Sequence, residues 1–106
     1  MPQNINANVK ITVLRRSFNE DFVEQYADSP WGACKKAEDA QEFISRGVNT
    51  PKGFCNWAWC DIQKYVMTLA RGGNLRGFKP GVYITCCTDG LRPVFFKLER
   101  IENEGE

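Results

Sequence analysis

Residues 53–73 read Gly-Phe-Cys-Asn-Trp-Ala-Trp-Cys-Asp-Ile-Gln-Lys-Tyr-Val-Met-Thr-Leu-Ala-Arg-Gly-Gly and carry the strongest helix signal of the chain. Asn56 is suited to accept a hydrogen bond from a first-turn amide as the N-cap, and Asp61 lies near the positive end of the helix dipole. Gly72 and Gly73 supply the stop. We therefore expect one helix of about four turns with a buried face. Its apolar residues recur at helical spacing: Ala58, Ile62, Tyr65, Val66 and Leu69.

The composition indicates one self-sufficient domain. The chain has 106 residues, of which 42% are hydrophobic, and we expect a single domain over residues 1–106 with an ordered core at about 9–101. The net charge of +1 leaves no overall field to hold nucleic acid or an anionic membrane. No apolar run reaches the roughly 18 residues of a membrane span, and the polar first residues do not form a signal peptide. We therefore expect a cytoplasmic protein with reduced thiols and no nucleic-acid or membrane partner.

The sequence contains five cysteines and no histidine. None of the cysteine spacings is the two-residue gap of a zinc knuckle or a redox dithiol, so a disulfide framework is not expected. The lack of histidine removes imidazole metal ligands and the histidine partner of serine or cysteine nucleophiles. Chemistry in this chain must use thiols, carboxylates, lysines, tyrosines or a bound cofactor.

The first half of the chain predicts a strand, a short helix and a second, short strand. Alternating apolar residues predict the first strand over 9–16. Residues 17–20 fit a capping box that begins a helix through Ala27, with Phe18, Phe22 and Tyr26 along one face. Residues 42–45 predict the short strand.

Residues 82–87 and 93–101 predict a β-hairpin around Thr88-Asp89-Gly90. A three-residue loop, with Gly90 left-handed, would pair Ile84 with Val94 and point Cys86 into the core. Cys87 would then point to the opposite face. The order strand, helix, short strand, helix, hairpin predicts an α+β domain whose small sheet is covered by the central helix.

Three blocks resemble a family of short, cysteine-containing bacterial proteins without an established activity. They are residues 10–16, residues 53–62 with Gly53-Phe54-Cys55, and residues 86–94 with Cys86-Cys87-Thr88-Asp89-Gly90-Leu91-Arg92-Pro93-Val94. The likeness spans about residues 9–101 and implies that Cys34, Cys55 and one or both of Cys86 and Cys87 are recurrent. In this family pattern a small residue such as alanine is more usual at the position of Cys60.

The cysteines form the first candidate site. Cys34, Cys55 and Cys87 come from three separate segments and can converge on a soft metal such as zinc or copper. Cys86 fits such a site less well, because adjacent strand residues point to opposite faces. The alternative is that these residues are small buried apolar side chains with inert thiols.

Cys55 is also a candidate catalytic or redox thiol. It lies at the start of a helix, where unpaired backbone N–H groups favour an anion and therefore a thiolate. Asp61 or Asp89 is the candidate acid or base beside it. No histidine partner is available, which argues against this role.

Aromatic and charged residues complete the candidate ligand site. Trp57 and Trp59 lie on different sides of the helix, so at least one is available for a pocket or a subunit interface. The alternative is that both pack in or around the core. Arg92 offers a planar guanidinium to an anion. The alternative is that Arg92 and Asp89 only form an ion pair that closes the turn. Arg15 and Arg16 indicate a solvated strand end.

Our leading interpretation is a small binding domain with a cysteine-lined pocket for a small molecule or soft metal at the start of the central helix. The first alternative is a cysteine-dependent enzyme centred on Cys55. The second is a structural subunit that forms homo-oligomers through an exposed tryptophan. The sequence does not indicate whether Cys60 contributes.

Overall fold

The computed structural model describes residues 6–101. Its first strand, β1 (Asn8–Arg16), is central in an antiparallel sheet and carries Val9, Ile11 and Val13 fully buried on one face. On either side lie the short strand β2 (Glu42–Ser45) and the last strand β4 (Val94–Ile101). The predictions for the first five residues and for the acidic tail, 102–106, lie outside the described residues.

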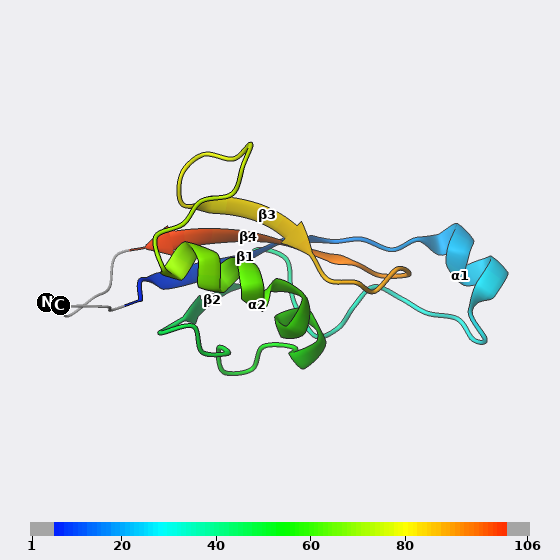
Figure 1. The fold of residues 1–106 in the computed structure, drawn as a ribbon. Helices are drawn as coiled ribbons and strands as arrows, with labels where there is room; N and C mark the ends of the chain where they lie inside the picture. Colours follow the sequence, from blue (N-terminus) through cyan, green and yellow to red (C-terminus); the bar gives the residue numbers. More distant parts are fainter. Residues whose placement is uncertain (1–5, 102–106) are drawn as a thin grey trace, which may run out of the picture.

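The sheet has four strands in the order β2-β1-β4-β3, where β3 (Val82–Cys86) forms the hairpin with β4. Two helices complete the fold: α1 (Glu20–Tyr26) and α2 (Asn56–Ala70). This confirms the α+β class and the predicted order of elements. Figure 1 shows α2 across one face of the sheet and α1 beyond the end of the strands.

The core lies between α2 and the sheet. The predicted helix face is confirmed, since Ile62, Val66 and Leu69 have no exposed surface and Ala58 is nearly buried. Full burial of one such aliphatic side chain is worth about 1.5–3 kcal/mol. The predicted stop is also confirmed, because α2 ends at Arg71 as C-cap and Gly72 follows with a φ of 89°.

Both predicted helix caps are wrong. Cys55 is the N-cap of α2 and Asn56 is its first helical residue, without a side-chain cap hydrogen bond. Asn19 precedes α1 in place of the predicted capping box, and its Nδ2 donates to the carbonyl oxygen of Gly90 at 2.6 Å. The side chain of Asn19, which is the N-cap of α1, thus contacts the hairpin loop and makes no cap hydrogen bond. Of the three aromatic residues predicted along one face of this helix, Phe18 precedes α1, and Phe22 and Tyr26 are exposed.

The hairpin register also differs from the prediction. Ile84 lies opposite Lys97, and Tyr83 lies opposite Leu98. The strands are joined by residues 87–93, and Gly90 does not have a positive φ. An odd change of register reverses the two faces of a strand, so Tyr83 packs against the core and Ile84 is exposed.

A β-bulge in β1 decides where its arginines point. The register with β4 shifts between Val13 and Arg15, so Arg15 lies opposite Phe95 and stacks over its ring at 5.0 Å. Arg16 then lies opposite Val94. The extra residue keeps Arg15 off the buried face, and it leaves Arg16 at the edge of the helix-covered side.

Candidate functional site

A cavity of about 240 Å³ lies at the N-terminal end of α2. Three thiols line it, from Cys34, Cys55 and Cys87. These are the three cysteines that the sequence interpretation grouped together. The remaining lining residues include both polar and apolar side chains: Lys36, Asn56, Trp57, Ala58, Asp89 and Arg92.

Cys55 reaches the cavity because it is the N-cap of α2. Its carbonyl oxygen accepts the first helical hydrogen bond, from the N–H of Trp59 at 2.9 Å. Its side chain is half-buried and makes no cap bond. The thiol therefore lies beside the first turn of the helix and makes no hydrogen bond to its free N–H groups.

Arg16 holds the segment that presents Cys34. Its Nη1 donates to the Cys34 carbonyl oxygen at 3.1 Å, and its Nε donates to Asp39 at 3.1 Å. The backbone N–H of Lys36 lies 3.4 Å from the Cys34 sulfur. The prediction of Arg16 as a solvated strand end is wrong, because the bulge in β1 directs it onto this loop.

Cys87 is the most buried of the five cysteines and follows the end of β3. Its N–H donates to the Val94 carbonyl oxygen at 3.1 Å, and its sulfur accepts from the Val94 N–H at 3.4 Å. The predicted facing was reversed: Cys87 belongs to the core and Cys86 is only half-buried. Burial, with smaller contributions from Cys87 and Asp61, raises the pKa of the Cys86 thiol.

Asp61 ties the hairpin loop to α2. Its carboxylate accepts the Thr88 N–H at 2.8 Å and the Thr88 hydroxyl at 3.0 Å. The same hydroxyl oxygen accepts a hydrogen bond from Trp57 Nε1 at 2.7 Å. Asp61 lies beyond the first turn of α2, so its role is this clamp and not the predicted dipole contact. It does not line the cavity but positions Trp57 and the start of the loop.

The two tryptophans of α2 have different environments. Trp57 is 54% exposed and lines the cavity, whereas Trp59 is buried against Phe54. Trp59 therefore does not line this cavity, and the predicted assembly through an exposed tryptophan would use Trp57. Sedimentation of wild type against Trp57→Ala tests that prediction, since a monomer at every concentration contradicts it.

Asp89 and Arg92 form the polar end of the cavity. Asp89 Oδ1 accepts the N–H groups of Leu91 and Arg92, and Asp89 Oδ2 accepts Arg92 Nε at 3.2 Å. The guanidinium also stacks over Trp31, 4.7 Å from the ring centroid. The pair closes its own turn, as one of the two alternatives from the sequence has it, and Arg92 also lines the cavity. The contact of Arg92 with an anion stays a prediction.

The described residues give the soft-metal hypothesis no support. Among residues 6–101, no group of three or more cysteine, aspartate or glutamate side chains is placed to hold a metal ion. Cys60 is exposed on α2 and does not line the cavity.

Several site residues were absent from the sequence interpretation. Lys36, Asn56 and Ala58 line the cavity, and Arg16 and Thr88 position it. Thr88 carried only a general signal, because its hydroxyl and its N–H are two donors that one carboxylate can accept. Arg16 carried none, since its direction depends on the bulge.

No protein-family model, curated protein or solved structure matches this chain. The resemblance to a family of short bacterial proteins therefore stays a prediction. Neither helix of the described residues is long and apolar enough to cross a membrane.

Proposed function

We propose that this chain is a small cytoplasmic binding domain whose ligand is a compact aromatic acid held in the thiol-lined cavity. The observation that carries the proposal is the convergence of Cys34, Cys55 and Cys87 on one cavity at the start of α2. Three segments far apart in sequence build this one wall, as a preformed ligand site requires.

The size and lining of the cavity select the ligand class. Its volume of about 240 Å³ equals that of roughly eight water molecules, which suits a single ring better than a drug-sized molecule. Trp57, Ala58 and the polarisable thiols supply apolar contact. Lys36 and Arg92 bring two positive charges against the one carboxylate of Asp89, so the polar end favours an anionic group.

Thiol protection tests the proposal directly. Benzoate should slow the reaction of Cys34 and Cys55 with N-ethylmaleimide, read peptide by peptide in a mass spectrometer. Cys60 is the internal control, because it is exposed and outside the cavity. Benzamide, which lacks the charge, should protect less, and Trp57→Ala should lose protection while Gln63→Ala, exposed on the same helix, retains it. Equal protection of Cys60, or none at any cysteine, contradicts the proposal.

A cysteine-dependent enzyme is the second candidate, favoured by the position of Cys55 as a half-buried N-cap that lines the cavity. One thiol should then react much faster than the others at neutral pH, and only Cys55→Ser should abolish that reaction. Native mass spectrometry with elemental analysis, on protein purified without chelator, covers the metal alternative. Stoichiometric zinc or copper that is lost in Cys55→Ser would replace the organic ligand by a metal.

A further inference from the structure

The helix α1 and residues 27–33 form an arm that extends beyond the end of the sheet (Figure 1), in a molecule that measures 56 × 29 × 20 Å. The arm is attached through the hairpin loop. The N–H of Ser17 donates to the Pro93 carbonyl oxygen, and the N–H of Asn19 donates to the Leu91 carbonyl oxygen, both at 2.8 Å. These bonds fix the base of the arm without covering its sides.

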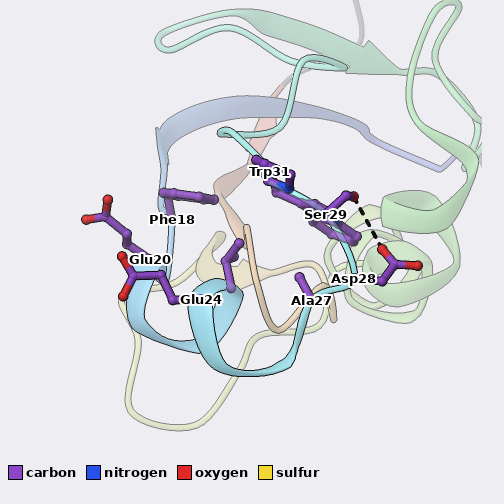
Figure 2. Close-up of a pocket in the computed structure, with 9 residues that line it drawn as sticks. Phe18, Glu20, Glu24, Ala27, Asp28, Ser29 and Trp31 are labelled. Carbon is purple, nitrogen blue, oxygen red and sulfur yellow. Dashed lines mark hydrogen bonds between the residues drawn. The ribbon is translucent and has the colours of Figure 1, made fainter.

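A groove of about 410 Å³ lies between α1 and residues 27–31. Figure 2 shows Phe18 and Trp31 across the groove from the helix ribbon, with Glu20 and Glu24 at one edge and Asp28 at the opposite edge. The apolar part of the wall is completed by Val23, Ala27 and Pro30. The groove shares no lining residue with the thiol cavity.

The arm, together with residues 17–19 that lead into it, is acidic. Residues 17–33 contain four carboxylates, from Glu20, Asp21, Glu24 and Asp28, and no lysine or arginine, although the whole chain has a net charge of +1. All four are exposed. Arg92 stacks on Trp31, and its charge is balanced by Asp89. The arm therefore attracts a positively charged partner.

Two further aromatic side chains of α1 are exposed, on the side of the helix away from the groove. Phe22 is 47% exposed and Tyr26 is 77% exposed. They are four residues apart and therefore lie on the same side of α1. The groove itself is lined by the rings of Phe18 and Trp31 and by Glu20 and Glu24. Rings together with carboxylates match the two interactions that a guanidinium makes best, namely stacking on a ring and a forked contact with a carboxylate.

We propose that this groove binds an extended, arginine-containing segment of a partner protein. The groove is wide enough for one arginine side chain and part of its neighbours, and its open side suits a peptide that runs across it. Glu20 and Glu24 would pair with the guanidinium at one edge, and Phe18 and Trp31 would contact its flat face.

A short peptide of alternating glycine and arginine is the probe. We expect saturable binding in isothermal titration at low ionic strength that weakens with added salt, and no binding of the citrulline version, which keeps the shape but lacks the charge. The double variant Glu20→Gln, Glu24→Gln should weaken binding roughly tenfold, as two exposed pairs of about 0.7 kcal/mol each predict. Asp21→Asn is the matched control, because Asp21 is exposed on α1 but does not line the groove.

Three outcomes overturn the proposal. Equal binding of the citrulline peptide removes the role of the charge, and equal weakening by Asp21→Asn means attraction to the arm without a groove. Self-association in sedimentation that the double variant abolishes means that a second copy of this chain, and not another protein, occupies the groove. All the substitutions are at exposed positions, and circular dichroism of each variant checks that the helices are intact.

Discussion

Removal of the Asp61 carboxylate should destabilise the domain by a defined amount. In wild type this carboxylate accepts both the N–H and the hydroxyl of Thr88, 27 residues away in sequence. Hydrogen bonds to a charged group contribute about 1.5–3 kcal/mol, and we take about 2 kcal/mol because the contact is partly exposed. Alanine returns about 0.6 kcal/mol through its higher helix propensity. Asp61→Ala should therefore lower the free energy of unfolding by roughly 1.4 kcal/mol and Tm by about 6–11 °C.

Urea unfolding followed by far-UV circular dichroism is the assay, since tryptophan fluorescence would also report the local change at Trp57. Gln63→Ala, exposed on the same helix, is the control for an alanine substitution that breaks no contact with Thr88. Thr88→Val keeps the backbone donor and removes the hydroxyl, so a double-mutant cycle with Asp61→Ala should give a coupling of about 0.5–1 kcal/mol.

The same change should expose the thiol cavity. Thr88 directly follows Cys87, so release of the loop should speed the alkylation of Cys87, which is 9% exposed in the intact fold. An unfolding free energy equal to that of Gln63→Ala, zero coupling and an unchanged Cys87 rate would together refute the clamp.

Two further predictions concern stability. Arg100→Lys should lower the free energy of unfolding in urea by about 2 kcal/mol. Arg100 Nη1 donates to the carbonyl oxygens of Leu69 and Gly73, and Nη2 donates to Asn74, and lysine cannot reproduce these three contacts at the end of α2 together. A loss of stability no larger than that of Lys97→Arg on the same strand contradicts this role. Because the pKa of Cys86 is raised in the folded protein, the thiol loses its proton first in the unfolded chain. The contribution of the Cys86 thiol to the free energy of unfolding is therefore fully present below the ordinary thiol pKa of about 8.5, and it is lost as pH rises through the raised value. Wild type should therefore lose more Tm than Cys86→Ala between neutral and alkaline pH, whereas parallel profiles would contradict it; Tyr83, whose pKa is also raised by burial and by Tyr65, is common to both proteins.

The sequence by itself determined the elements and their order. The buried face of α2, the buried alternation of β1 and the bounds of β2 follow from periodicities of 3.6 and 2 within single segments, and local propensity suffices for those. The grouping of Cys34, Cys55 and Cys87 also followed from the sequence, because each lies at an element end or in a loop.

Only the tertiary structure decided the faces and the fine geometry of the site. The register of the hairpin buries Cys87 in place of Cys86, and the Thr88 contact with Asp61 joins the loop to α2. The direction of Arg16 depends on a bulge opposite β4, and the side chain of Asn19, the N-cap of α1, donates to Gly90 in the hairpin loop and makes no cap bond. In each case the local sequence allows two conformations of nearly equal free energy, and a contact with a distant segment decides between them. No local pattern therefore encodes the result.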